Sequence, residues 1–221
     1  MRELGPGLWH WEASHPQWEG SVRWGRLVSS YAIDDGGLLL LFDPIAPPSE
    51  IVELAAGRET AIVLTCPWHE RAARGLVERF NWPLFTPPPD SQEDLMRKYG
   101  VTAEEAAGGS PDLAWLQAGD TGAAHLYAAG DRLPVGVEAF AGWEHNDVVL
   151  WIADRRAVVV GDALVDFGQG LEISPSEGST KLMTREQIAE RLRPLLALPV
   201  EQVLATHGGP TDRAALERAL A

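Results

Sequence analysis

A short apolar run that ends in a polar loop is the feature of this sequence that most constrains its fold. Residues 61–64 read Ala-Ile-Val-Leu, which is typical of one buried strand. The loop that follows, residues 65–71, reads Thr-Cys-Pro-Trp-His-Glu-Arg. From about His69 to Phe80, apolar residues recur at three- and four-residue spacing, which predicts a helix with one face on a sheet. A strand, a loop and a helix in this order present the loop side chains at a sheet edge.

Patterns on either side of this unit predict two sheets with helices outside them. Alternating apolar residues near the start predict a hairpin that turns at residues 34–37, Asp-Asp-Gly-Gly. Strands are expected over residues 7–13, 22–33, 38–42, 124–128, 135–141, 147–152, 157–160 and 202–205, and helices over residues 49–56, 184–198 and 212–221. Two packed sheets covered by outer helices form a four-layer αββα sandwich of mixed α/β class, which is the predicted fold.

Composition predicts a single domain that spans residues 1–221. No Ser/Gly-rich linker divides the chain, and 45% of its residues are hydrophobic, enough for a sizeable core. Lys and Arg number 18 against 32 Asp and Glu, and the net charge of −14 disfavours nucleic acid as a partner. The sequence has no signal-peptide pattern and no apolar stretch near the ~20 residues of a membrane span, so we expect a cytoplasmic protein without a membrane partner.

Residues 87–109 differ in character from the rest. Three prolines, Pro87–Pro89, precede the acidic segment 90–94 and two weakly helical stretches near Leu95 and Ala103. Long connections of this kind are either functional or simply solvated. We therefore expect an insertion here, which is either a lid over a site or a connection without a chemical role.

The order of these pieces resembles the metallo-β-lactamase superfamily. The resemblance rests on the hairpin from Ser29–Ile33 to Leu41–Asp43, the strand end Leu64-Thr65, the segment Val158–Ala163 and the segment Ala205–Gly209. It covers nearly the whole chain and implies a four-layer sandwich of the metallo-β-lactamase type, with metals bound at one edge. Asp162 would bridge two metals in that family, and His207 would bind one of them.

The superfamily's metal signature is mostly replaced in this chain. The family places His, any, His, any, Asp, His after the strand-end Thr, and those four positions hold Cys66, Trp68, Glu70 and Arg71. A further family His follows a Gly, and the matching residue here is Trp143. The resemblance therefore implies a degenerate site.

The chemistry of these replacements argues against two metals. Indoles do not coordinate zinc, so Trp68 and Trp143 would line or fill the vacated space. Arg71 stays protonated and would place positive charge beside a dication. We therefore predict that the site holds no metal, and that Arg71 pairs with Asp162 in place of the lost metal charge.

A competing interpretation keeps one metal, zinc or another divalent ion. Its ligands would be Asp162 and His207, with a third drawn from Cys66, His69, Glu70 or His145, all of suitable chemical type. The favoured third ligand is His69.

Three classes of function follow from these alternatives. The first is a metal-free binding module for a small organic ligand, with a pocket made of Cys66, Trp68, His69, Arg71, Trp143 and His145. The second is a single-metal hydrolase of an ester, thioester or amide, in which Glu70 and Asp162 are the catalytic candidates. The third uses Cys66 as a nucleophile activated by His69 or His207, although Pro67 removes a helix-start amide there.

Overall fold

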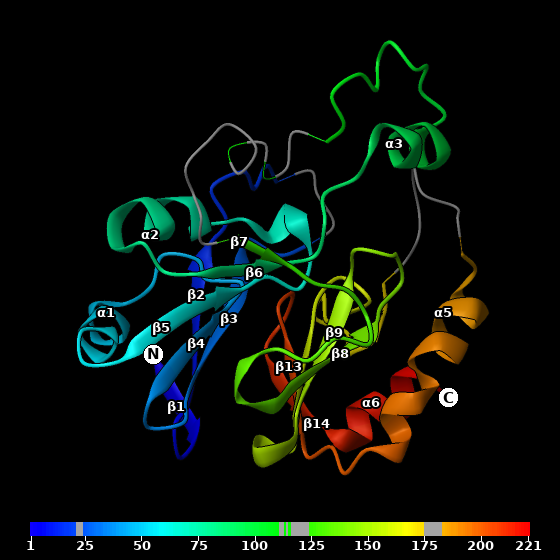
Figure 1. Cartoon of the computed structure of the whole chain (residues 1–221). Helices are drawn as coiled ribbons and strands as arrows, with labels where there is room; N and C mark the ends of the chain where they lie inside the picture. Colours follow the sequence, from blue (N-terminus) through cyan, green and yellow to red (C-terminus); the bar gives the residue numbers. More distant parts are fainter. Residues whose placement is uncertain (21–23, 111–112, 114, 116–123, 175–182) are drawn as a thin grey trace.

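The computed structural model describes residues 1–20, 24–110, 113, 115, 124–174 and 183–221. Two sheets pack against each other, and helices cover the outer face of each (Figure 1). Helices α1 (Ser49–Ala55) and α2 (Ala73–Phe80) lie on the first sheet, and α5 (Arg185–Leu192) and α6 (Arg213–Ala219) lie on the second. This is the predicted four-layer αββα sandwich.

The first sheet has seven strands in sequential order. They are β1 (Arg2–Gly5), β2 (Leu8–Ser14), β3 (Leu27–Asp34), β4 (Leu38–Phe42), β5 (Glu59–Val63), β6 (Leu84–Thr86) and β7 (Ala124–Leu126). The first four are antiparallel, and β4 through β7 are parallel. Part of the predicted second strand, residues 21–23, lies outside the described residues.

The second sheet has five strands in the order β14-β13-β10-β9-β8. Their bounds are β8 (Val137–Ala141), β9 (Val148–Ile152), β10 (Ala157–Val160), β13 (Gln202–Ala205) and β14 (Pro210–Asp212). Only the β10–β13 pair in this sheet is parallel. A small separate ladder joins β11 (Leu164–Val165) to β12 (Glu172–Ile173).

The core follows the alternation of the strands. In β10, Val158 and Val160 face α5 and α6, where they pack near Ile188 and Leu216. Val159 faces the other way, into the layer between the sheets. Because a strand buried on both faces needs apolar residues throughout, this continuous run of valines is suited to a central position.

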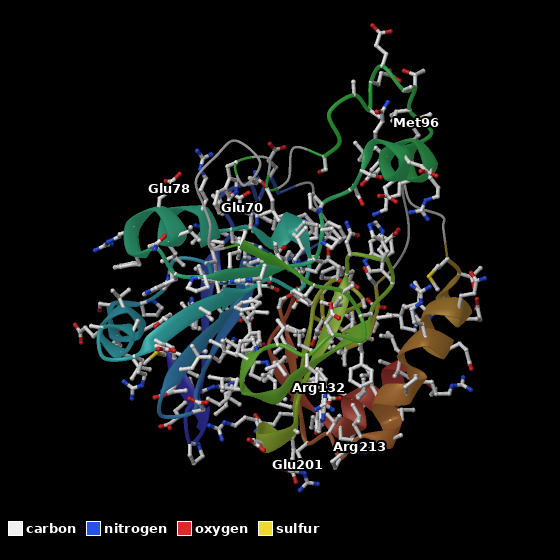
Figure 2. The ribbon with its side chains drawn as sticks, in the orientation of Figure 1. Glu70, Glu78, Met96, Arg132, Glu201 and Arg213 are labelled. Atoms are coloured by element: carbon white, nitrogen blue, oxygen red, sulfur yellow. The ribbon has the colours of Figure 1, made fainter. Side chains whose placement is uncertain are left out.

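The remaining helical segments are short. Those whose bounds fall within the described residues are the 3₁₀ turns η1 (Pro67–His69), η2 (Pro134–Gly136), η3 (Ala153–Arg155) and η4 (Arg193–Ala197), and helix α3 (Gln92–Tyr99). The helix expected from His69 begins only at Ala73, because Arg71 adopts a positive φ of 45° that interrupts it. Figure 2 shows Met96 of α3 far from the two sheets. No helix in the described part of the chain has the length and apolar character to cross a membrane.

Candidate metal centre

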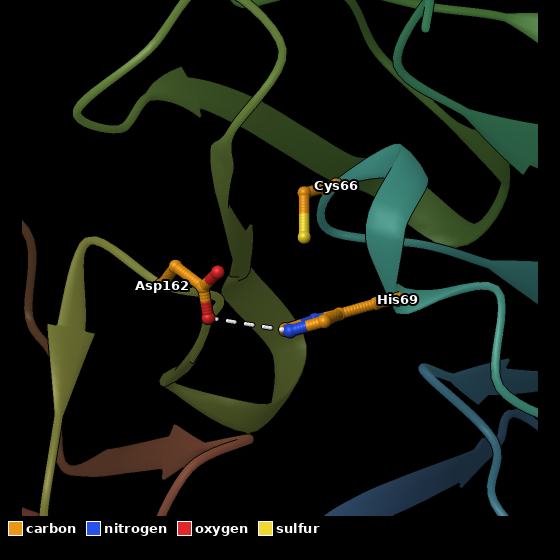
Figure 3. A group of neighbouring side chains, drawn as sticks. All are labelled: Cys66, His69 and Asp162. Atoms are coloured by element: carbon orange, nitrogen blue, oxygen red, sulfur yellow. Dashed lines mark ion pairs between the residues drawn. The ribbon is translucent and has the colours of Figure 1, made fainter. Parts of the chain in front are cut away.

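Three loops bring two imidazoles and one carboxylate together at one edge of the sandwich. His69 ends η1, which follows β5, whereas Asp162 follows β10 and His207 follows β13. Since β10 and β13 are parallel neighbours, the loops that follow them leave the same end of the sheet. Figure 3 shows the His69 ring directed at the Asp162 carboxylate.

The three side chains form a nearly equilateral triangle of ligand atoms. His69 Nε2 lies 3.2 Å from Asp162 Oδ1, His207 Nε2 lies 3.3 Å from the same oxygen, and the two nitrogens are 3.3 Å apart. Around zinc with ligand distances of about 2.0 to 2.1 Å, two ligand atoms of a tetrahedron lie about 3.3 to 3.4 Å apart. The triangle therefore has the size of one face of a zinc coordination shell.

A buried carboxylate fixes the His69 ring from behind. Asp43 follows β4 and is fully buried, and its Oδ2 lies 2.9 Å from His69 Nδ1. The same carboxylate accepts hydrogen bonds from the Thr65 backbone N–H (2.8 Å) and hydroxyl (2.6 Å). A histidine that donates Nδ1–H to a carboxylate keeps the Nε2 lone pair free for a metal, an arrangement common around metal-binding histidines.

Hydrogen bonds also fix the position of Asp162. Its Oδ2 accepts the indole N–H of Trp68 at 2.5 Å, which leaves Oδ1 for the two histidines. Its backbone N–H donates to Asp147 Oδ1 at 3.0 Å. A Cβ on Gly161 would lie 2.8 Å from that oxygen, and one on Gly142 would lie 2.0 Å from Asp147 Oδ2. Only glycine fits at these two positions, and the absence of a side chain there lets the Asp147 carboxylate lie close to the backbone.

The geometry of η1 explains why His69 enters the site instead of Glu70. In a 3₁₀ turn, side chains three residues apart lie on one side. The backbone N–H of His69 donates to the carbonyl of Cys66 (3.1 Å), so these two residues share a side. Glu70, the family position that kept a carboxylate, lies one residue further and lines a neighbouring cavity near Pro16. Figure 2 shows it beside α2.

Arg71 does not pair with Asp162, so the predicted ion pair is wrong. Its Nη1 donates to the carbonyls of Ser29 (2.7 Å) and Asp43 (2.9 Å), and its Nη2 donates to that of Thr206 (3.4 Å). No ion pair between described residues joins Arg71 to Asp162. Two features explain why the predicted ion pair does not form. Arg71 has a positive φ, and three backbone carbonyl groups accept hydrogen bonds from its guanidinium and hold it in place.

The pKa values follow from this arrangement. Burial and Arg71 lower the pKa of His69, but Asp43 and Asp162 outweigh them and raise it to about 9. Burial raises the pKa of Asp162, yet His69 and His207 hold it well below its usual range. Without a metal, His69 is therefore doubly protonated, and its ring directs Nδ1–H at Asp43 and Nε2–H at Asp162.

Cys66 lies beside the triangle and is fully buried. Its sulfur forms a group with the ligand atoms of His69 and Asp162 in which all three atoms lie within 4.8 Å of one another. Burial and then Asp162 raise the pKa of the thiol well above its usual range. A buried thiol of this kind is a poor nucleophile, so the cysteine-nucleophile alternative loses its support.

A cavity of about 250 Å³ opens onto the triangle. Its walls are His15, Gln17, Trp24, Trp68, His69, Asp162, Val165, Phe167, Ser174 and His207. The sequence interpretation did not include His15, Trp24 or Phe167. Burial, followed by Arg71, lowers the pKa of His15 to about 4, so its ring is neutral. No spacing pattern marked these residues, because they come from irregular loops.

Trp143 and His145, in contrast to the prediction, do not line this cavity. They face a separate one of about 580 Å³ together with Arg97, Met183 and Arg191. The Trp143 backbone N–H donates to Asp147 Oδ2 (3.0 Å), and its side chain packs against the apolar core of the second sheet. His145 lies 3.7 Å from Asp94. The predicted pocket residues that do gather around the triangle are Cys66, Trp68 and His69, and Arg71 lies just beneath them.

A second buried cluster anchors the segment 87–109. Lys98 Nζ donates to Asp90 Oδ1 at 2.7 Å and lies 3.4 Å from Glu144 Oε2. Asn146 Nδ2 also donates to Asp90 Oδ1, at 2.9 Å. The ammonium lies 5.6 Å from the centre of the Trp68 ring. None of the described residues of segment 87–109 lines the 250 Å³ cavity, so the observed contacts fasten it beside the site.

Comparison with solved structures shows the fold of this chain. It is similar to the DIM-1 metallo-β-lactamase exposed to ceftazidime (TM-score 0.65, 15% identity, 99% of this chain and 93% of that one). It is also similar to ST1585, an archaeal superfamily protein from Sulfolobus tokodaii (0.64, 16%, 97% and 84%), and to TTHA1623 in a di-iron-bound form (0.57, 23%, 87% and 93%). No protein-family model and no curated protein sequence matches the chain.

The chain therefore has the metallo-β-lactamase fold, as the resemblance predicted. The predicted absence of metal is not confirmed, because the described residues include groups that fit a divalent ion. The favoured third ligand, His69, does lie with Asp162 and His207.

Proposed function

We propose that this chain is a metallo-β-lactamase superfamily protein that binds one divalent metal through His69, Asp162 and His207. The observation that carries the proposal is the triangle of ligand atoms with edges of 3.2 to 3.3 Å. The Asp43 contact supports it, since it sets the His69 tautomer that a metal needs.

A single metal fits better than two. Trp68 occupies a position that holds a ligand in the family, and its N–H instead orients Asp162. Arg71 places a fixed positive charge beneath the site, which disfavours a second dication. The other group of described residues that could hold an ion, Asp90, Asp94 and His145, shares no ligand with the triangle.

The proposed reaction is hydrolysis of a small ester, thioester or amide. When bound, a divalent metal supplies activation of water and polarisation of a carbonyl. The residues that line the cavity orient the substrate and exclude water. Trp24, Trp68 and Phe167 offer aromatic surface to an apolar acyl group and keep bulk water out. His15 accepts a hydrogen bond from the Gln17 backbone N–H at Nδ1 (3.3 Å), so the neutral ring carries its proton on Nε2 as a donor.

A metal-free binding module is the second candidate. It is favoured by the pKa of His69, which rises to about 9, so that a proton on Nε2 can take the place of the metal between His69 and Asp162. The cavity would then hold a small organic ligand against its aromatic walls.

Elemental analysis of protein purified without chelator distinguishes the single-metal hydrolase from the metal-free binding module. The hydrolase proposal expects one equivalent of zinc, iron or manganese per chain, and hydrolysis of nitrophenyl esters or a thioester that chelation abolishes and metal restores. His69→Ala removes one ligand and should lose both. His125→Ala is the matched control, since it removes an imidazole that stacks on Phe85 and belongs to neither group of potential ligands. Protein that contains no metal and takes up none in a zinc titration would overturn the proposal in favour of the binding module.

A further inference from the structure

We propose that His15 is a catalytic residue that donates its Nε2–H to the carbonyl oxygen of the substrate. This inference rests on the proposed function, because it needs a substrate carbonyl held beside His69, Asp162 and His207. It names the side chain of the cavity wall that stabilises the negative charge developing on that oxygen.

The backbone holds His15 at the wall of the candidate site. His15 directly follows β2, and its N–H donates to the carbonyl of Arg26 at 2.9 Å. Its own carbonyl accepts a hydrogen bond from the N–H of Trp18 at 3.1 Å. The side chain lines the same 250 Å³ cavity as the three residues of the triangle. Its place in the wall is therefore fixed from both sides of the peptide chain.

An aromatic contact links the His15 ring to one corner of the triangle. The rings of His15 and Trp24 meet edge to face, with centroids 4.9 Å apart and planes at 76°. Trp24 makes a second edge contact with His207, at 5.7 Å and 62°. Only one aromatic side chain thus separates His15 from His207, so a small acyl group in the cavity can reach both.

The hydrogen bonds of the ring determine which nitrogen is the donor. Nδ1 accepts the backbone N–H of Gln17 at 3.3 Å. A ring nitrogen that accepts an N–H carries no proton, so the ring is neutral and its proton lies on Nε2. Burial lowers the pKa of His15 to about 4, which agrees with a neutral ring. No hydrogen bond from Nε2 occurs among the described residues, so this N–H is available to a ligand.

A neutral donor suits the chemistry of ester hydrolysis. The oxygen of a water molecule bonds to the carbonyl carbon, the bond to the alkoxy group breaks, and the alcohol leaves with a proton from that water. While the carbon is tetrahedral, negative charge develops on the carbonyl oxygen. An N–H already directed at this oxygen stabilises the charge, and the ring keeps its own proton throughout.

His15 is better suited to this role than the other polar residues of the wall. Gln17 and Ser174 line the same cavity. Within the described part of the chain, no hydrogen bond fixes either of these side chains. The rate gain from a donor depends on its orientation before the reaction begins, which only His15 offers here.

Steady-state kinetics of the zinc-loaded protein with 4-nitrophenyl acetate test the proposal. His15→Phe keeps a flat ring and removes the N–H, so kcat should fall on the order of 100-fold with little change in KM. His15→Gln supplies another N–H donor and should recover part of the loss. His125→Phe, which changes the imidazole stacked on Phe85, should retain the wild-type kcat. Elemental analysis should find one equivalent of zinc in every variant.

Two further measurements do not depend on turnover. Methylphosphonate has tetrahedrally arranged oxygens like those of the intermediate, and calorimetry measures its affinity for the zinc-loaded protein. This affinity should fall in His15→Phe and recover in part in His15→Gln. Nitrogen NMR of the metal-free wild-type protein should show the His15 proton on Nε2, with the signals assigned by their loss in His15→Phe.

The possible failures are distinguishable. Wild-type kcat and wild-type methylphosphonate affinity in His15→Phe would overturn the role of His15 and leave the proposed function intact. A proton on Nδ1 in the wild-type protein would overturn that role even if the variant does not fold. Wild-type protein that binds no zinc, or binds it without hydrolysing esters or thioesters, would overturn the proposed function and this inference together.

Discussion

Two buried clusters of charged residues, side by side in the fold, neutralise their carboxylates in different ways. The first, here called the clasp, comprises Asp90, Lys98, Glu144 and Asn146. The second, here called the site cluster, comprises Asp43, His69, Asp147, Asp162 and His207. The clasp contains a lysine of its own, in direct contact with both of its acids.

Among the described residues, no lysine or arginine makes an ion-pair contact with the acids of the site cluster. The nearest guanidinium, that of Arg71, donates its hydrogen bonds to backbone carbonyls. Arg71 acts on Asp43 and Asp162 only through space, so at contact distance their charge is balanced either by a proton on His69 or by a metal ion. The contrast teaches that a buried set of acids without its own lysine or arginine partner is the place to expect an exchangeable cation.

Removal of the lysine from the clasp should give the largest effect on stability. Lys98→Met leaves the carboxylates of Asp90 and Glu144 without their cation in the interior, and loss of one member of a buried pair costs on the order of 3 to 5 kcal/mol. Chemical denaturation with and without zinc measures the change. The loss should be the same under both conditions, and a variant that zinc restores to wild-type stability would contradict the separation of the two clusters.

Removal of metal should destabilise the wild-type protein by a somewhat smaller amount. A ligand at 100 times its dissociation constant stabilises a folded protein by about 2.7 kcal/mol. Chelation should therefore lower the melting temperature, and added zinc should restore it. Asp162→Asn, which keeps the shape of the side chain but removes its charge, should abolish this response. A response of wild-type size in Asp162→Asn would place the metal elsewhere.

Loss of the indole N–H should weaken metal binding without loss of the fold. Trp68→Phe keeps an aromatic ring near Lys98 but leaves Asp162 Oδ2 without its donor. Groups that orient a metal ligand typically contribute 10- to 100-fold to affinity, so the zinc dissociation constant should rise by about that factor. Zinc calorimetry checks this, with Trp143→Phe as the control outside the cavity. Equal affinities in the two variants would contradict a positioning role for Trp68.

The pH dependence of stability should reveal the contribution of His10, a histidine that lacks an acidic partner. Burial, followed by Arg2, lowers the pKa of His10 from 6.5 to about 4, the opposite of the shift at His69. The folded protein therefore favours neutral His10, and this contribution is present above pH 6.5 and is lost as pH falls toward 4. His10→Gln should flatten the stability curve in that window. The curve is measured by denaturation at several pH values, and an unchanged slope would assign the acid loss to other groups.

Much of the fold could be predicted from the sequence because its periodicity is strong. The valines of β10 and the apolar run of β5 are buried as expected, and the helix face of α2 packs on the sheet. The start of α2 was placed too early, since nothing in the sequence indicates the left-handed conformation of Arg71.

The site was less predictable because it depends on a local turn. The family spacing points to Glu70, but the 3₁₀ turn begun by Pro67 places His69 in the site. The walls at His15, Trp24 and Phe167 come from loops whose spacing along the chain carries no periodic signal. The carbonyl contacts of Arg71 join residues up to 135 positions apart, which a single sequence does not reveal.

The most direct test of the single-metal account is an anomalous difference map at the zinc edge, from crystals of the protein grown with zinc. The account predicts one peak, within about 2.0 to 2.2 Å of His69 Nε2, His207 Nε2 and Asp162 Oδ1. Two peaks at this edge of the sandwich, or none while His69 remains between Asp43 and Asp162, would contradict it.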